Sequence, residues 1–356
     1  MIRQKNLADV ARLAGVHAST VSRVLNPATR SMIRPAVAQK VLEAVAKVGY
    51  RPHAIAASLR TQRSSTVGVL IPDLTNPLFA AIVRGIEDAL ADAGYTAMIG
   101  NSDNEPVRER TVLQKMRERR VDGLILATAH REDALIAECR ADNIPLVLVN
   151  RTVDDRAVSA VVVDDAVGIK LAVDHLVGLG HRAIVHLAGP QDLSTGRLRQ
   201  RSFARAMTAA GQAVDARLVL VCKAMTEAEG RRQFAALLAR RTKFTAVLAG
   251  NELIAMGCYD ELAARGLAWP AAVSIVGYND IRFVDRMAPP LTTVRIPQYD
   301  MGAEAARLLL ARMRDPRAPV QTITLRPTLI VRGSTARVRG QKSDDRGQKK
   351  NPPSVV

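Results

Sequence analysis

The chain contains 356 residues, of which 48% are hydrophobic, and it carries a formal net charge of +17. This length accommodates two or three domains, and the apolar content is sufficient for buried cores. The charge is concentrated at the ends: residues 1–63 hold 11 Lys and Arg against 2 Asp and Glu, and residues 337–350 hold 6 against 2. A basic small region attached to a nearly neutral large one indicates that the small region binds a polyanion, because neutralised phosphates release counterions.

The cysteines and the apolar runs bear on cellular location. Cys139, Cys222 and Cys258 lie far apart in apolar surroundings and are typical of reduced core residues. No apolar run approaches the ~18 residues needed to span a bilayer, and the N-terminus lacks a cleavable apolar segment. No Cys/His cluster has metal-ligand spacing. We therefore expect a cytoplasmic protein without a metal or a cofactor.

Three helices are predicted at the start of the chain. Apolar residues at helical spacing in 7–13 are followed by Gly15, which can supply the positive φ of a tight turn, and by a helical run over 17–25. A third helix is predicted in "RPAVAQKVLEAVAKVGY", with Pro35 near its first turn and a buried stripe of Val37, Val41, Leu42, Val45 and Val48. The pattern predicts a helix-turn-helix domain over residues 1–51, whose second helix fits a DNA major groove. A small helical bundle with an ordinary solvated face is the alternative.

The next segment, residues 52–63, contains the Ala-rich stretch "PHAIAASLR". Short isolated helices are marginal in water, so we expect this hinge helix and linker to fold only when docked. The alternative is a flexible linker with Leu59 buried against the following domain.

From residue 64 to 334, strand-like apolar runs alternate with amphipathic helices. One series begins at residues 67–71 and a second at residues 183–187. This rhythm predicts an α/β protein with two doubly wound parallel-sheet halves and a ligand cleft at the carboxyl ends of the strands. Asp, Asn and Arg in the predicted strand-end loops suit a polyhydroxylated ligand, with Phe79 available to pack on an apolar sugar face.

An enzyme on the same sheet architecture is an alternative to a binding protein. The stretch "GLGHRA" (178–183) matches a dinucleotide fingerprint in letters, but it lies between a helix and a strand rather than after a strand. Phosphate-binding loops, metalloprotease motifs and nucleophile elbows are missing from the sequence. The sequence therefore predicts no catalytic residues.

Five stretches occur in order along residues 7–334: "DVARLAGVHASTVSRVLN", "VGYRPHAIAASLR", "VGVLIPDLTNPLF", "HLVGLGHRAIVHLAGP" and "VSIVGYNDIRFVDRMAPPLTTVRIP". In these stretches the sequence resembles the lactose-repressor/galactose-repressor (LacI/GalR) family of bacterial regulators. The resemblance implies a periplasmic-binding-protein-like core whose chain crosses between halves near Asp164, Val294 and Thr322. The halves would then comprise residues 64–163 plus 295–321 and residues 164–294 plus 322–334.

The resemblance also implies DNA contacts. Ala18, Ser19 and Arg23 would read bases, while Thr20 and Ser22 would hold phosphates. Leu59 matches the family's hinge leucine, which wedges between base pairs in the minor groove. His17 stands where the family usually has Ser, and we expect this altered helix cap to reduce stability.

For the effector, the resemblance implies a pocket formed by Phe79, Asn150, Thr195, Arg199, Met225, Asn251 and Asn279. Asn279 replaces a frequent Asp, Met225 replaces a frequent aromatic residue, and Glu252 follows Asn251 where Asp is usual. An amide both donates and accepts hydrogen bonds, so the preferred effector is expected to differ from those of the familiar sugar repressors. Because the Arg199 guanidinium can pair with an anion, an effector that carries a carboxylate or a phosphate is also compatible with this pocket.

Together these observations predict a cytoplasmic transcriptional repressor controlled by a sugar or sugar acid. It would act as a homodimer on a roughly palindromic double-stranded DNA operator, because two-fold protein symmetry requires two-fold DNA symmetry. The basic tail, residues 335–356, has no apolar periodicity and is expected to be disordered. A sugar-binding transport protein, and after it an enzyme, remain as alternatives.

Overall fold

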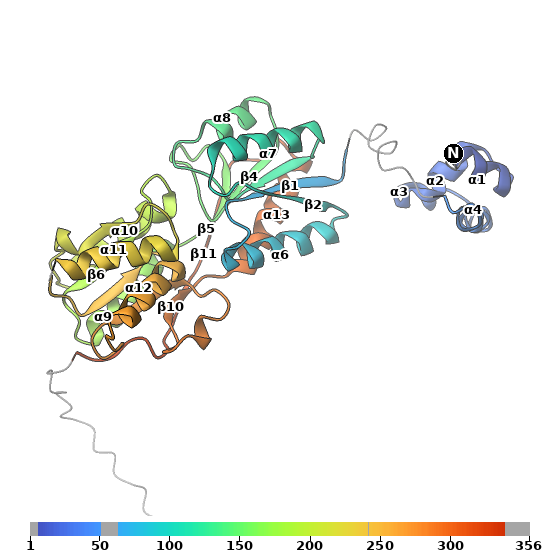
Figure 1. Cartoon of the computed structure of the whole chain (residues 1–356). Coiled ribbons are helices and arrows are strands. Elements are labelled where there is room, and N and C mark those ends of the chain that lie inside the picture. The colour runs from blue at the N-terminus through green and yellow to red at the C-terminus, as the bar shows by residue number, and fades with distance from the viewer. Residues whose placement is uncertain (1–5, 51–62, 241, 339–356) are drawn as a thin grey trace, which may run out of the picture. The chain divides into compact units, whose positions relative to one another are not determined.

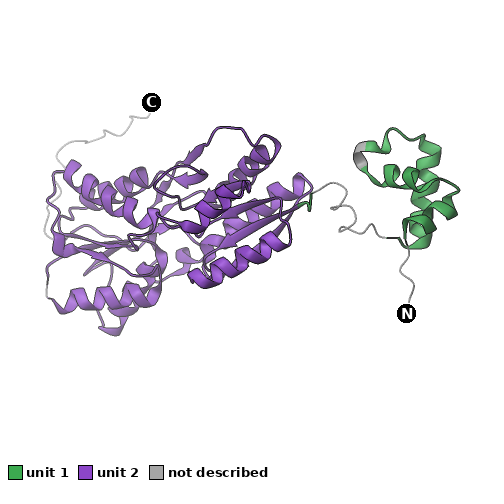
Figure 2. Cartoon of the chain, turned by 90° about the horizontal axis from the view of Figure 1, so that it is seen from above, with its two compact units in different colours: residues 1–65 green, residues 66–356 purple. Residues whose placement is uncertain are grey.

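The computed structural model describes residues 6–50, 63–240 and 242–338. The chain forms two compact units, Met1–Ser65 and Thr66–Val356, coloured separately in Figure 2. Most of the predicted hinge segment, including Leu59, lies outside the described residues, as does the tail from residue 339. The tail was predicted to be disordered from residue 335, but its first residues are hydrogen-bonded to the region of helix α9 (Asp165–Gly178): Thr335 Oγ1 lies 3.0 Å from His175 Nε2, and the Val338 N–H donates to the Leu179 carbonyl at 3.0 Å.

The first unit is helical in its described part. Its elements are α1 (Leu7–Ala14), α2 (Ala18–Leu25), the short α3 (Pro27–Arg30) and α4 (Pro35–Val48). Gly15 ends α1 with φ +66°, which is the left-handed conformation expected for the turn. Val10, Val21, Val24 and Val41 form the centre of its core.

Two details of this unit differ from the sequence prediction. The helix α3 was not predicted, because four residues are too few to show a periodic pattern. The buried face of α4 is centred on Ala38, Val41 and Ala44, while the predicted stripe residue Val37 is only half-buried. This helix packs against α1 and α2.

The second unit contains two six-stranded sheets, which Figure 1 shows as two lobes. The first sheet has the order β11-β5-β4-β3-β1-β2, and all its strands are parallel. Helices α6 and α13 cover one face and α7 and α8 the other, because alternate strand residues point to opposite sides. The elements are β1 (Thr66–Ile71), α6 (Pro77–Asp92), β2 (Thr96–Asn101), α7 (Pro106–Glu118), β3 (Gly123–Leu126), α8 (Ala134–Ala141), β4 (Leu146–Val149), β5 (Ser159–Val163), α13 (Gln298–Arg314) and β11 (Thr322–Leu325).

The second sheet repeats this topology with the order β12-β10-β9-β8-β6-β7, and only β12 is antiparallel among its described strands. Helices α9 and α10 pack together on one face, and α11 and α12 on the other. The elements are α9 (Asp165–Gly178), β6 (Ile184–Ala188), α10 (Ser194–Ala209), η1 (Ala216–Leu218), β7 (Val219–Val221), α11 (Glu227–Ala239), β8 (Ala246–Ala249), α12 (Glu252–Ala264), β9 (Ser274–Asn279), η2 (Val284–Arg286), β10 (Thr292–Arg295) and β12 (Thr328–Ile330).

The last crossing between the halves lies later than the sequence indicated. Residues 322–334 were assigned to the second half, but β11 pairs in parallel with β5 and extends the first sheet. The chain crosses after Leu325, and only β12 joins the second sheet. The alternation of exposed and half-buried residues in β11 is typical of an edge strand, and this pattern does not specify which sheet it joins.

The strand order places the candidate ligand site. In each sheet the order reverses between the first strand and the third, that is between β1 and β3 and between β6 and β8. Ligands of open α/β sheets bind outside the carboxyl ends of the strands at this reversal. The same ends carry the polar loops singled out in the sequence.

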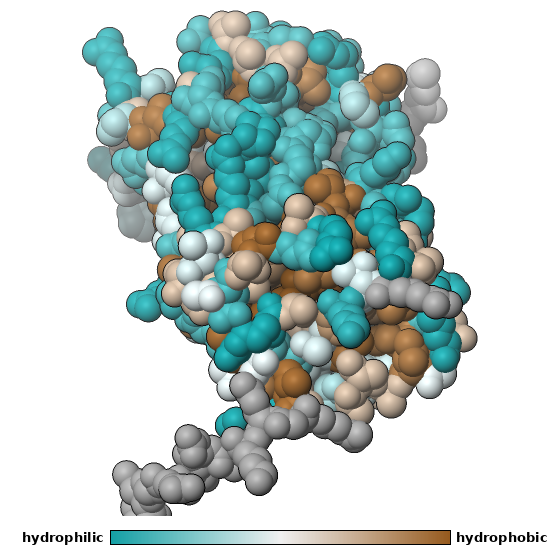
Figure 3. All heavy atoms as spheres, turned by 90° about the vertical axis from the view of Figure 1, so that its left-hand side faces the viewer, coloured by the Kyte–Doolittle hydropathy of each residue, from teal (hydrophilic) through white to brown (hydrophobic). Residues whose placement is uncertain are grey.

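The surface is largely polar. Figure 3 views the second unit from the end that carries the second sheet, where hydrophilic residues predominate above and apolar residues gather lower down. Within the described ranges, no helix is both long and apolar enough to cross a membrane.

Candidate nucleic-acid interface and ligand site

Helix α2 presents the predicted DNA-reading side chains. Ser19 and Arg23 are exposed, and Ala18, Thr20 and Ser22 are half-buried, whereas Val21 and Val24 are buried against the other helices. The polar side chains of α2 therefore lie toward its outer side and the two valines on its inner side. The guanidinium of Arg23 is therefore accessible to a base edge.

His17 caps α2. Its Nδ1 atom accepts a hydrogen bond from the Ser19 backbone N–H at 3.3 Å and lies 2.8 Å from the Ser19 hydroxyl oxygen. The expected loss of the cap is thus offset, because the imidazole performs the role of a Ser side chain. The far end of α2 is held by α3, since Thr29 donates to the Arg23 carbonyl at 2.9 Å and Arg30 donates to the Val24 carbonyl at 2.8 Å.

Arg199 is the centre of a polar network in the second unit. It lies on α10 and is only 3% exposed. Its Nε donates to Asp165 Oδ1 at 2.9 Å, its Nη1 to the Gly250 carbonyl at 2.6 Å and its Nη2 to Asn279 Oδ1 at 3.4 Å. The guanidinium carbon also lies 3.7 Å from the centre of the Tyr278 ring. Arg199 thereby links the ends of β8 and β9 to the start of α9.

The start of α10 lies close to the end of β6. A side chain at Gly196 would place its Cβ 2.0 Å from the Pro190 carbonyl oxygen, so glycine is required for this approach. The close contact brings Arg199, one turn later, to the strand ends.

Glu252 orients Asn279. Asn279 Nδ2 donates to Glu252 Oε2 at 3.2 Å, and the Thr293 hydroxyl and the Asp280 backbone N–H donate to Oε1. Burial raises the pKa of the Glu252 carboxyl to about 7, against the lowering effect of these hydrogen bonds. Asn279 has φ +107°, a conformation that Asn tolerates better than most residues.

Asn251 and Met225 are joined in a different way. Asn251 Oδ1 accepts from the Ile254 N–H at 2.9 Å and caps α12, while its Nδ2 donates to the Met225 carbonyl at 3.2 Å. The amide oxygen is thus used by the cap of α12, and the amide nitrogen holds the loop before α11. Phe79 is buried near the start of α6, within the core of the first half.

Asn150 and Thr195 have polar side chains that the protein leaves available. Asn150 follows β4 with φ +68° and is 8% exposed, and Thr195 is buried in the first turn of α10. Within the described ranges, neither side chain hydrogen-bonds to another protein group. A strained backbone that carries an unused amide is typical of a binding position.

The two halves touch beside this network. Arg131 N–H donates to the Asp192 carbonyl at 2.9 Å, and its Nη1 donates to the Gln191 carbonyl at 3.2 Å. His130 Nδ1 lies 3.1 Å from Asp192 Oδ2, and Thr152 N–H donates to the Ser194 hydroxyl at 3.0 Å. These bonds bring together loops that follow β3 and β4 with the loop that follows β6.

The profile of the family described as "Bacterial regulatory proteins, lacI family" matches residues 6–53, and that of the "Periplasmic binding protein-like domain" matches residues 173–335. The ribose operon repressor of Escherichia coli (strain K12) is 32% identical over 337 residues, which cover 92% of this chain and 99% of the repressor. The chain belongs to the lacI family of bacterial regulatory proteins.

Other members of the lacI family agree in sequence and fold. The transcriptional repressor PurR of Photobacterium profundum is 31% identical over 333 residues, covering 92% of this chain and 98% of the repressor. A lac repressor dimer bound to operator and the anti-inducer ONPF is 27% identical with a TM-score of 0.83, covering 94% and 100% of the two chains. A complex of the regulator CelR with cellobiose is 31% identical with a TM-score of 0.72, covering 93% and 99%. The predicted family and fold class are confirmed.

As a lacI-family member, the chain is a DNA-binding transcriptional regulator under the control of an effector. The sequence prediction missed Asp165, Tyr278 and Gly250 as partners of Arg199, and Thr293 as a partner of Glu252. Asp165 directly follows a predicted crossing point, which was the only local signal. The others contribute through backbone groups, ring faces or hydroxyls that sequence patterns do not distinguish.

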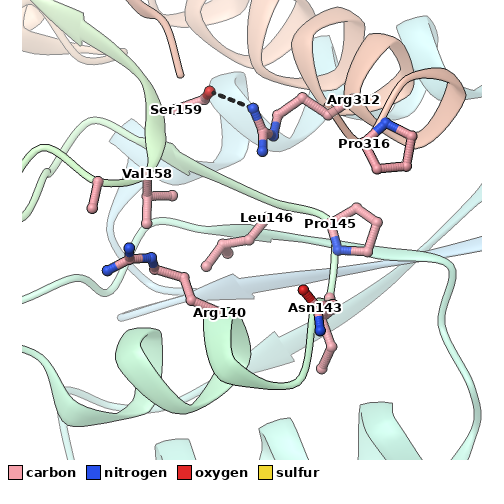
Figure 4. Close-up of a pocket in the computed structure, with 10 residues that line it drawn as sticks. Arg140, Asn143, Pro145, Leu146, Val158, Ser159, Arg312 and Pro316 are labelled. Carbon is pink, nitrogen blue, oxygen red and sulfur yellow. Dashed lines mark hydrogen bonds between the residues drawn. The ribbon is translucent and has the colours of Figure 1, made fainter. Parts of the chain in front are cut away.

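A separate cavity of about 200 Å³ lies near the amino ends of β4 and β5, at the opposite end of these strands from the candidate ligand site. Figure 4 shows Arg312 bonded there to Ser159 at 3.4 Å, with Arg140 nearby. None of the predicted effector residues lines it.

Proposed function

We propose that this protein is a cytoplasmic repressor that binds a roughly palindromic operator as a homodimer and releases or tightens its hold when a sugar binds the second unit. The observation that carries the proposal is the pairing of an exposed α2, with Arg23 free to read a base, with a buried polar network at the strand-order reversal of the second unit.

The DNA contacts proposed are those of α2 and the hinge. Ala18, Ser19 and Arg23 read bases, Thr20 and Ser22 hold phosphates, and Leu59 wedges into the minor groove. Arg23 carries most of the discrimination because a guanidinium can bond guanine N7 and O6 together.

The effector contacts proposed are Phe79, Asn150, Thr195, Arg199, Met225, Asn251 and Asn279. Structural relatives support a sugar: CelR binds cellobiose, and a regulator of Enterococcus faecium that is 30% identical, with a TM-score of 0.67 over 77% of this chain, binds ribose. Asn150 and Thr195 are the groups most available to hydroxyls, because their side chains are not used by the protein.

A sugar-binding transport protein, the first alternative, would share the second unit but would not need a DNA-reading helix such as α2. An enzyme would need a nucleophile or acid–base pair in the cleft, and we assign no such role to any residue. A gel shift with the DNA upstream of the gene separates these possibilities. We expect a salt-sensitive, sequence-dependent shift, and its absence with and without sugars would refute the repressor.

Coupling between the DNA site and the sugar site requires that the two affinity changes be equal. If a sugar changes operator affinity by some factor, operator DNA must change sugar affinity by the same factor. Calorimetric titration of the sugar with and without operator measures this. Equal affinities would show that the sugar is not coupled to DNA binding.

A further inference from the structure

We propose that Asp165 sets the charge selectivity of the effector site, by neutralising Arg199 so that an uncharged polyhydroxylated ligand is accepted and its anionic counterpart is rejected. This inference rests on the proposed function and specifies the chemical class of its ligand.

Arg199 and Asp165 form a buried ion pair. The side chains of Arg199 and Asp165 are 4% and 6% exposed, and the Nε–Oδ1 distance is 2.9 Å. Each Arg199 nitrogen also has a protein acceptor, since Nη1 bonds the Gly250 carbonyl and Nη2 bonds Asn279 Oδ1. A carboxylate on a ligand would therefore meet a cation that is already paired with a carboxylate and already donates one hydrogen bond from each of its nitrogens.

Other charged side chains near the strand ends are also paired within the protein. Asp280 is held by Arg295 at 2.6 Å and Arg332 at 2.8 Å. Arg131 pairs with Asp154 and bonds the Gln191 carbonyl. These cations are likewise occupied by protein groups.

Arg151 follows β4, and Arg197 lies near the start of α10. Arg151 is buried with its Nη1 on the Thr128 carbonyl at 3.3 Å, and the buried carboxylate of Glu109 interacts electrostatically with it. Arg197 lies two positions before Arg199 on α10, and residues two apart on a helix do not share a face. Neither supplies a free cation on the face of α10 that carries Arg199.

In the part of the chain that the structure describes, two polar side chains of the proposed site remain without a protein hydrogen bond. The side chains of Asn150 and Thr195 are neutral, one an amide and the other a hydroxyl. Such groups donate to and accept from hydroxyls with equal ease but give no net attraction to an anion. The site is therefore polar, and its arginine charge is balanced by a protein carboxylate before any ligand binds. These two properties suit a neutral sugar.

The experiment uses the full-length protein and sugars matched in skeleton but not in charge: ribose with ribonate, glucose with gluconate, and galactose with galacturonate. Thermal shift identifies the pairs that bind, and calorimetry gives both affinities. For wild-type protein we expect at least one neutral sugar to bind, and each bound pair to favour its neutral member.

The Asp165→Asn variant keeps the shape and an acceptor oxygen but removes the carboxylate that forms the ion pair with Arg199. We expect the acid-to-neutral affinity ratio to rise by about tenfold to a hundredfold, the range of one charge-assisted contact. Asp174→Asn is the matched control, because it removes an exposed carboxylate paired with Lys170 on the same helix. Its ratio should equal that of the wild type, and Asp165→Glu should retain the neutral preference.

Wild-type protein that prefers an acid, or an Asp165→Asn ratio equal to that of Asp174→Asn, would overturn the inference. So would the failure of every neutral sugar to bind. If Asp165→Asn does not fold, the wild-type preferences decide. Operator binding without ligand, measured in parallel, tests the proposed function separately, since it depends on the first unit.

Discussion

At the residue scale, Glu252 links pH to stability. Its pKa of about 7 in the folded chain exceeds the ordinary value of 4.5, because burial disfavours the carboxylate. The folded chain therefore holds a proton that the unfolded chain releases between these two values. The stabilisation is complete below about pH 4.5 and is lost as the pH rises through about 7.

Glu252→Gln removes this titration. We expect the free energy of unfolding of the variant, relative to wild type, to rise by about 2 kcal/mol between pH 5.5 and pH 8. Denaturant unfolding at several pH values measures the difference, and Glu118→Gln, an exposed carboxyl, is the control. The comparison with wild type is necessary because His186, whose pKa burial lowers to about 4, has the opposite dependence in acid. A difference that does not change with pH would contradict the prediction.

Arg23→Ala tests base reading. We expect a loss of about 1–3 kcal/mol on operator DNA with little change on random DNA, because a bidentate base contact is specific. Arg12→Ala, which removes an exposed cation paired with Asp9 on α1, should weaken both DNAs equally if it has any effect. Gel shifts at fixed salt measure both variants. If Arg23→Ala weakens binding to operator and to random DNA equally, Arg23 contacts only phosphates.

Arg199→Ala tests the buried ion pair between Arg199 and Asp165. Truncation leaves Asp165 buried without its cation, and breaking a buried pair in this way costs about 3–5 kcal/mol. We expect a fall in melting temperature without ligand, measured by calorimetry. A variant as stable as wild type would show that the pair is not buried in solution.

At the element scale, the N-terminus of α2 depends on an unusual cap. His17→Ala should destabilise the first unit by about 1 kcal/mol, because the Ser19 N–H loses its acceptor, whereas His17→Ser should retain most of the stability. Thermal unfolding followed by circular dichroism measures the difference. Equal stability of the Ala and Ser variants would show that His17 does not act as a cap.

At the scale of the whole molecule, the contacts between His130, Arg131 and the loop of residues 189–194 hold the halves together. Asp192→Ala removes the carboxylate near His130 but retains the Asp192 carbonyl that accepts from Arg131. Both side chains are substantially exposed, so the expected effect is below about 1 kcal/mol. We expect a sugar affinity up to about fivefold weaker.

Asp154→Ala is the control for that change. It removes an ion pair of Arg131 that lies within the first half rather than across the halves. Calorimetric titration of a sugar should therefore show a smaller effect. An equal or larger effect would place the contribution in Arg131 itself rather than in the contact between halves.

The sequence by itself determined the classes of element and their order. Periods of 3.6 and 2 residues are local properties, so they predicted the first three-helix pattern and the two α/β series. Strand-end polar residues were also predictable, because they follow apolar runs directly. Asn279, at the end of β9, was named on this basis together with the family resemblance, whereas Arg199, which lies on α10, was named through the resemblance.

The tertiary structure decided the pairings. Asp165 and Arg199 are 34 residues apart, and Glu252 and Asn279 are 27 apart, so their contacts exist only once the sheet brings the strand ends together. The same holds for β11, whose sheet depends on which open edge it reaches, and for Asn251, whose amide is used by a helix cap and a loop. Local patterns specify what a segment becomes, whereas charge compensation depends on distances in space, and it is that compensation which determines the ligand chemistry proposed for this site.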